Sequence, residues 1–199
     1  MRTLLLLLCL AQDSIDDREK NTLLQLEKTK LSFSLSDLSL KDASAVVCKL
    51  TGLEIAIDEA VEDETRHTMD VTDKPLAQVL DELCAPAKLA WLQLDGQILI
   101  TTKKGREALT GGPRTEDLKK DKVLWDKLRA KASIAAESKL GDALKMLGDA
   151  AGVKIACTAA PDQKLAATPE LSVLGCLRLV AWQKGLTLEI QDSRVTLKK

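Results

Sequence analysis

The sequence contains few aromatic residues and one histidine. Phenylalanine, tyrosine and tryptophan make up 2% of its 199 residues. We therefore expect a core of Leu, Val, Ile and Ala, with little material for stacking on sugars or nucleobases. Residues 12–104 carry 11 Lys/Arg against 18 Asp/Glu, and residues 131–199 carry 10 against 7. Neither half is basic enough for nucleic acid, so we expect no nucleic-acid partner.

The residue sets for metal centres and nucleophilic catalysis are also missing. His67 is the single histidine and no CxxC pair occurs, so a zinc site is not expected. Residues 58–64 (DEAVEDE) lack the spacing and the turn glycine of a calcium loop, so we expect a solvated acidic loop. No GxSxG or Cys/His motif gives His67 a nucleophile to activate. We predict no catalytic residue, no cofactor and no metal ligand.

No apolar run is long enough to cross a bilayer as a helix, which needs about 20 residues. The chain begins MRTLLLLLCLA, with one positive charge, a short apolar run and small residues before polar Gln12. This is the layout of a signal peptide. We expect cleavage after Ala11, no integral membrane span, and a periplasmic or secreted protein.

Four cysteines would remain after that cleavage. Each lies within an apolar pattern, where cysteine also serves as a small core residue. Export would permit their oxidation, so disulfides stay an open alternative to the buried thiols that we favour. The four residues are Cys48, Cys84, Cys157 and Cys176.

One pattern occurs twice, displaced by 100 positions. Residues 40–57 read LKDASAVVCKLTGLEIAI, and residues 140–157 read LGDALKMLGDAAGVKIAC. The shared residues suit an amphipathic helix, the glycine that ends it and a following strand. Asp42 and Asp142 recur in the first helical turn, where the helix dipole stabilises a carboxylate, so we interpret them as structural. The matching pairs are Leu40/Leu140, Asp42/Asp142, Ala43/Ala143, Gly52/Gly152, Ile55/Ile155 and Ala56/Ala156.

The periodicity of the first copy predicts the order strand, helix, strand, strand, helix, hairpin. A preceding helix is capped by Ser14 with Asp17 and runs to about Lys28. We expect Asp81 and Glu82 on a solvated helix face, and a short third strand whose edge could accept a partner strand. The predicted elements are strands at 31–36, 53–57 and 67–71, helices at 40–51 and 73–83 with Pro75 in the first turn, and a hairpin of 89–94 and 97–101 turned by Asp95-Gly96.

The second copy follows the same order more faintly. A helix at Asp117–Ala130 precedes it, and residues 110–113 (TGGP) form a linker. We expect Trp125 to dock one copy against the other. For Trp91 and Trp182 we favour core filling over the alternative of an interface anchor. The predicted elements are a weak strand at 133–134, a helix at 140–151, a strand at 153–157, a poor third strand at 165–168, a helix at 171–182 and a hairpin of 186–190 and 194–198 turned by Asp192-Ser193.

A family resemblance lies in two segments of the first copy. They read KLSFSLSDLSLKDASAVVCKLTGLEIAID and MDVTDKPLAQVLDELCAPAKLAWLQLDGQILI. The first copy resembles the STN family, the short domain at the N-termini of secretins and TonB-dependent receptors, and more loosely the secretin N-domains. The likeness covers residues 31–104 well and residues 131–199 more faintly. It implies a periplasmic domain that acts by contact with other envelope proteins.

Together these patterns predict an α+β protein of two tandem β-α-β-β-α-β-β domains, each preceded by a helix. The expected divisions are a signal peptide (1–11), a helix (12–30), a first repeat (31–104), a linker and helix (105–130) and a second repeat (131–199). We expect an exported, non-enzymatic adaptor that binds another protein of the bacterial cell envelope, associated with a secretin or TonB-type system. The alternative is a periplasmic protein that binds a small molecule or an envelope polymer.

Overall fold

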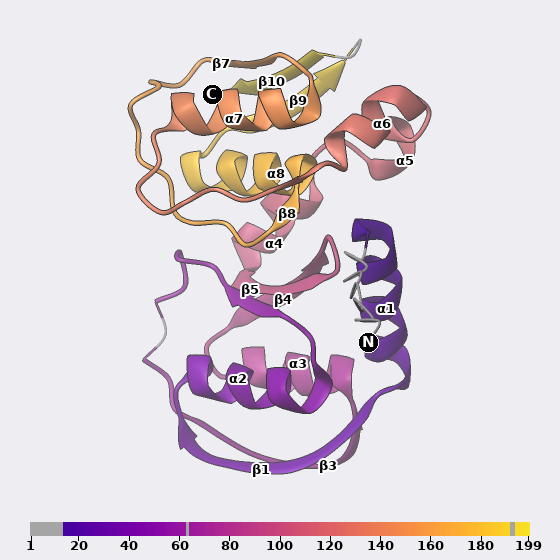
Figure 1. Ribbon diagram of the computed structural model, residues 1–199. Helices are drawn as coiled ribbons and strands as arrows, with labels where there is room; N and C mark the ends of the chain where they lie inside the picture. Colours follow the sequence, from indigo (N-terminus) through magenta and orange to yellow (C-terminus); the bar gives the residue numbers. More distant parts are fainter. Residues whose placement is uncertain (1–13, 63, 192–193) are drawn as a thin grey trace, which may run out of the picture.

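The computed structural model describes residues 14–62, 64–191 and 194–199. The protein is mixed α+β, with helices packed on several small sheets (Figure 1). The expected signal peptide and the Asp192-Ser193 turn lie outside the described residues. No described helix is both long enough and apolar enough to cross a membrane.

The chain up to Thr102, called the first half below, contains a two-stranded and a three-stranded sheet. Strands β1 and β3 pair antiparallel, and the other sheet has the order β2-β5-β4, with β2 parallel to β5. The elements are α1 (Ile15–Lys28), β1 (Lys30–Leu38), α2 (Leu40–Thr51), β2 (Ile55–Ile57), β3 (His67–Pro75), α3 (Leu76–Cys84), β4 (Leu89–Leu94) and β5 (Gln97–Thr102).

The second half, from Lys103 onward, repeats this arrangement after three helices. Its sheets are β6-β8 and β7-β10-β9, and β7 is parallel to β10. The order β-α-β-β-α-β-β therefore occurs twice along the chain. The elements are α4 (Lys103–Thr110), α5 (Thr115–Leu118), α6 (Lys122–Leu128), β6 (Lys131–Ala132), α7 (Leu140–Ala151), β7 (Ile155–Cys157), β8 (Leu171–Ser172), α8 (Val173–Lys184), β9 (Thr187–Gln191) and β10 (Arg194–Lys198).

Local signals place several elements where the sequence predicts them. Ser14 and Ser39 cap α1 and α2, since each side-chain oxygen accepts the backbone N–H three residues later. Gly52 ends α2 with φ of 72°, a left-handed conformation that glycine adopts without steric cost. Asp95 and Gly96 also have positive φ and form the tight turn between β4 and β5.

Two of the predicted boundaries in the first half are wrong. Pro75 does not lie in the first turn of α3: it is the last residue of β3 and pairs with Lys30. Its φ of −56° and ψ of 141° keep the backbone extended, and its missing N–H costs nothing at a helix N-cap. The third strand is also not short, because β3 contains nine residues paired along β1.

The second half departs from the predictions at several places. Its first strand, β6, is Lys131–Ala132 rather than 133–134, and residues 171–172 form β8 rather than the start of the helix. The expected helix at 117–130 is divided into α5 and α6, because Asp121 accepts the N–H of Leu124 and starts a new helix. Residues 103–110 form α4, which the pattern did not reveal. Residues 165–168 form no strand: β8 pairs with β6 instead, after Pro169, which cannot donate to a ladder.

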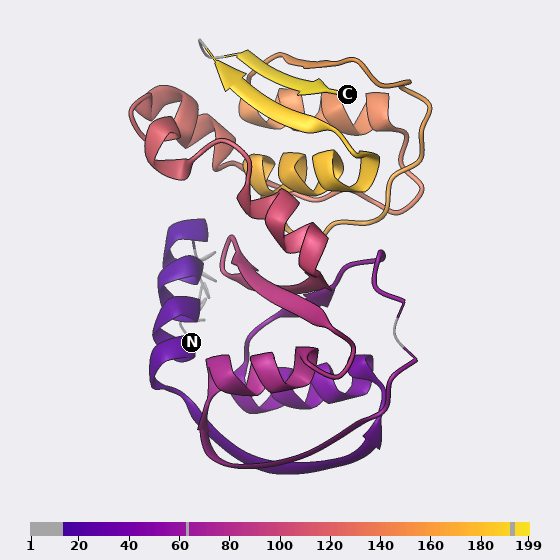
Figure 2. The same ribbon diagram turned by 180° about the vertical axis from the view of Figure 1, so that it is seen from behind.

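The core runs across both halves. Leu92, Leu94 and Leu99, on one face of the β2-β5-β4 sheet, belong to the same buried cluster as Leu109 of α4 and Leu177 of α8. The opposite face of this sheet packs against α2 and α3 (Figures 1 and 2). The sheet is thus covered on both faces, and the expected division after residue 104 falls within α4.

Candidate functional site

The turn between β4 and β5 inserts between α1 and the start of α8. Asp95 is 6% exposed, and its Oδ2 accepts hydrogen bonds from both the N–H and the hydroxyl of Ser172, each at 2.7 Å. The hydroxyl of Ser172 accepts in turn from the N–H of Gly175. A carboxylate of the first half therefore sits at the N-terminus of a helix of the second half, where the helix dipole favours negative charge.

This contact replaces a missing part of a helix cap. In α1 and α2 the cap serine donates its hydroxyl to the aspartate three residues later, at 2.7 Å in both helices. In α8 the residue three positions after Ser172 is Gly175, which has no carboxylate. Asp95 supplies that carboxylate from the other half, and a Cβ at Gly175 would overlap its Oδ2. The second half thus needs the first half to complete this cap.

Arg129, which follows α6, binds the other oxygen of Asp95. Its guanidinium donates to Asp95 Oδ1 at 2.9 Å, to Glu19 and to Asp16, and its side chain is 10% exposed. Burial alone would lower the pKa of Arg129, but the hydrogen bonds and charges of these carboxylates offset this effect, so its pKa is raised. The Trp125 ring lies 5.2 Å from the guanidinium carbon. Trp125 supports the junction through Arg129.

A second polar contact joins the halves at Asp58. Its Oδ2 accepts from the Thr101 hydroxyl and from Nε1 of Trp182, both at 2.6 Å. Asp58 is 8% exposed, so the expectation of a solvated acidic loop is wrong for this residue. Trp182 also packs on Gly105 of α4, where a Cβ would lie 3.0 Å from the indole Cζ2. Trp182 therefore joins the halves, although the sequence favoured core filling for it.

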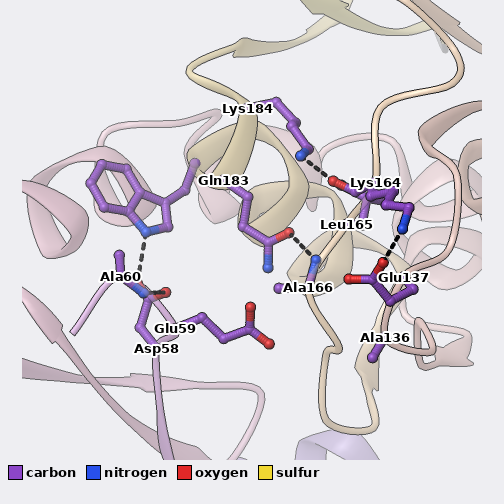
Figure 3. A pocket seen from close by; sticks show the side chains of 11 residues that line it. Asp58, Glu59, Ala60, Ala136, Glu137, Lys164, Leu165, Ala166, Gln183 and Lys184 are labelled. Carbon is purple, nitrogen blue, oxygen red and sulfur yellow. Dashed lines mark hydrogen bonds and ion pairs between the residues drawn. The ribbon is translucent and has the colours of Figure 1, made fainter. Parts of the chain in front are cut away.

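An open cleft lies beside this contact, between the halves (Figure 3). It has a volume of about 510 Å³ and is lined by the first half at residues 58–60 and by the second half around α8. Glu59 and the amide of Gln183 extend toward it in Figure 3, while Lys164 bonds Glu137 and Lys184 donates to the Lys164 carbonyl. Carboxylate, ammonium and amide groups around an open space suit a polar ligand.

The remaining singled-out residues do not gather at one site. His67 is buried in β3, and the Asp42 carboxylate accepts the Ser39 hydroxyl at the start of α2. Glu82 is not simply solvated: Lys74 bonds it and lowers its pKa. Among the described residues, no group of three or more His, Cys, Asp or Glu side chains is placed to hold a metal ion.

The four cysteines are free thiols. Cys84 and Cys176 are buried, while Cys48 and Cys157 are partly exposed. Burial raises the pKa of Cys84 to about 12 and that of Cys176 to about 11, because a thiolate loses its hydration there. The expectation of buried thiols therefore holds for Cys84 and Cys176, but not for Cys48 and Cys157.

No protein-family model matches the chain, and no curated protein matches its sequence. The resemblance to the STN family thus rests on the residue pattern of the chain itself.

Proposed function

We propose that this protein is an exported, non-enzymatic adaptor of the bacterial cell envelope, built from two tandem STN-like domains. The repeated element order and the repeated strand order of the three-stranded sheets support a duplication. The layout of the first eleven residues supports export. Another envelope protein, in a secretin or TonB-type system, would be its partner.

The polar junction between the halves carries this proposal. Asp58, Asp95 and Arg129 are largely buried charged residues between the halves, and each is bonded to a partner across the junction. Charged groups held in this way fix geometry, because moving them would leave buried charges unpaired. Two modules locked in one arrangement suit a protein that holds partners at a set distance.

Site-specific photocrosslinking in the envelope of a bacterial host tests the adaptor role. A photoreactive amino acid would replace Leu23 of α1 or Val123 of α6, which are 52% and 68% exposed. We expect one envelope protein to crosslink at one of these positions and to be displaced by excess unlabelled protein. A purified protein that turns over a substrate and crosslinks to nothing at either position would reject the adaptor role.

A second candidate function follows from the cleft of Figure 3, which is lined by both halves. In this hypothesis the cleft binds a polar small molecule or a segment of an envelope polymer. A melting screen with cell-wall fragments and oligosaccharides would give a shift of several degrees for a true ligand. Gln183→Ala should abolish that shift, and an unchanged shift in this variant would place the ligand elsewhere.

A further inference from the structure

Strand β4 is the outer strand of the three-stranded sheet in the first half. Leu94 pairs with Gln97 across the two-residue turn, so alternate residues of β4, counted back from Leu94, exchange hydrogen bonds with β5. The backbone groups of the residues between them point away from β5, and no other described strand pairs with them. The residues whose backbone N–H and C=O groups point away from β5 are Leu89, Trp91 and Gln93.

A groove follows this free edge. Its first part, of about 540 Å³, is lined by β4 together with α3 below and α4 above, and β4 is the strand nearest the viewer between these helices in Figure 2. Its second part, of about 380 Å³, continues along residues 92–94, and Thr110 of α4 lines both parts. The six residues of β4 span roughly 20 Å at about 3.3 Å each, which is enough for a short extended peptide.

The first part of the groove has a small excess of positive charge. Lys88, Lys103 and Arg106 line it, and none of the three has an ion pair or a side-chain hydrogen bond with any other described residue. The carboxylates there are Asp81 and Glu107. Three cations therefore face two carboxylates there, although residues 12–104, which include β4 and α3, carry net charge −7.

Trp91 provides a fixed apolar surface in the same part. Its Nε1 donates to Asp81 Oδ1 at 2.8 Å, so the indole is held in one orientation and the Asp81 carboxylate is engaged. Trp91 is half-buried and its ring lines the groove. An apolar side chain of a ligand would pack on it, as tryptophan commonly does at binding hot spots.

The second part of the groove contains polar groups without partners. Nε2 of Gln93 and Nε of Arg178 are buried and donate to no acceptor among the described atoms. Arg178 donates to the Pro113 carbonyl at 3.0 Å. Burial lowers its pKa by more than the charges of Asp95 and Glu19 raise it, and the charge of Arg129 lowers it further. Buried donors of this kind gain free energy when an acceptor arrives.

We propose that an extended acidic peptide of a partner protein adds to β4 as a fourth strand of the β2-β5-β4 sheet. Its backbone would pair with the free edge of β4, its carboxylates would lie against Lys88, Lys103, Arg106 and Arg178, and an apolar side chain would cover Trp91. The proposal rests on the adaptor function, for which it names the docking surface and the chemistry of the partner. Charge complementarity selects this occupant over a neutral or basic peptide.

A random octapeptide library displayed against the purified protein tests the charge requirement. We expect selected peptides to be enriched in Asp and Glu, and Lys103→Glu to raise the Kd of a selected peptide about fivefold or more. Lys104→Glu is the matched control, because it makes the same charge change at the next residue of α4, outside the groove; its Kd should change less than about twofold. Selection of neutral or basic peptides, or equal Kd values for the two variants, would overturn the proposal.

Amide hydrogen exchange with the selected peptide bound tests strand addition itself. The amides of Trp91 and Gln93 face outward, so peptide binding should slow their exchange about tenfold or more, whereas the amide of Leu92, already paired with β5, should change little. Unchanged exchange at Trp91 and Gln93 would show that the peptide binds in another way. If no acidic peptide binds while an envelope protein still crosslinks at Leu23 or Val123, the adaptor function stands and the β4 proposal falls.

Discussion

The central strands β5 and β10 hold the same place in two sheets of the same strand order, but they are buried differently. Every residue of β5 from Gln97 to Thr101 is buried. In β10 the burial alternates, with Val195 and Leu197 buried and the two ends exposed. The first sheet is enclosed by helices on both faces, whereas the second sheet has one face toward solvent.

This difference in burial shows that the second half covers one face of the β2-β5-β4 sheet of the first half. Leu99 of β5 pairs with Ala56, and Thr196 of β10 pairs with Ala156, so the leucine and the threonine occupy equivalent positions. Leu99 packs in the cluster shared with α8, and the residue at the same place in β10 is polar. Terminal units of repeat proteins likewise end in a polar face.

The largest expected effect comes from Asp95→Ala, which removes the carboxylate that joins the halves. It leaves Arg129 without its most buried partner and the cap of α8 incomplete, so we expect a loss of about 3–5 kcal/mol in the free energy of unfolding. Urea denaturation measures this loss. Asp117→Ala, which breaks an exposed ion pair with Lys120, is the control and should leave the midpoint unchanged. Equal midpoints for the two variants would mean that the junction contributes little.

The next largest effect on the free energy of unfolding is expected at Leu99, when it is compared with its equivalent Thr196. Leu99→Ala should lower the free energy of unfolding by about 2–4 kcal/mol, because a buried leucine loses its contacts and leaves a cavity. Thr196→Ala should change it by less than about 0.5 kcal/mol, since that face of β10 is not enclosed. Similar losses at both positions would contradict the difference between the sheets.

A smaller effect is expected at the second junction contact. Trp182→Phe keeps most of the ring but removes the N–H that donates to Asp58, so a buried carboxylate loses one of its donors. We expect a loss of about 1–2 kcal/mol, measured as a lower Tm. Trp91→Phe also loses a hydrogen bond to a carboxylate, but to the exposed Asp81. A larger loss of stability in Trp91→Phe than in Trp182→Phe would contradict a stabilising role for the hydrogen bond between Trp182 and Asp58.

The reaction rates of the four cysteine thiols compare the cores of the two halves without any substitution. Cys84 and Cys176 should react slowly with a thiol reagent at pH 8, because their raised pKa values leave little thiolate and both are buried. Their rates should rise only as the pH climbs above 9 toward these values. Cys48 and Cys157 are partly exposed and should react first. Four equal rates in the folded protein would contradict the burial of Cys84 and Cys176 in the cores of their own halves.

The sequence predicts the locally encoded elements well and the junction poorly. The caps at Ser14 and Ser39, the stop at Gly52 and the Asp95-Gly96 turn depend on neighbouring residues, so a pattern reveals them. Helix α4 escaped prediction because it is short and contains Gly105.

The junction contacts join residues that lie far apart in the chain. Asp58 and Trp182 are 124 positions apart, and Asp95 and Ser172 are 77 apart. No local signal marks the first pair. Gly175 is the one hint of the second pair, because it stands where the caps of α1 and α2 have an aspartate.

Native-state hydrogen exchange tests the shared core most directly. Because the second half covers the sheet of the first, the amides of Ile100 in β5 and Val195 in β10 should exchange through the same global opening. We predict that their free energies of opening agree to within about 0.5 kcal/mol and fall in parallel with added urea. A value for Val195 lower than that for Ile100 by about 2 kcal/mol or more would show that the second half opens by itself, and would contradict this account.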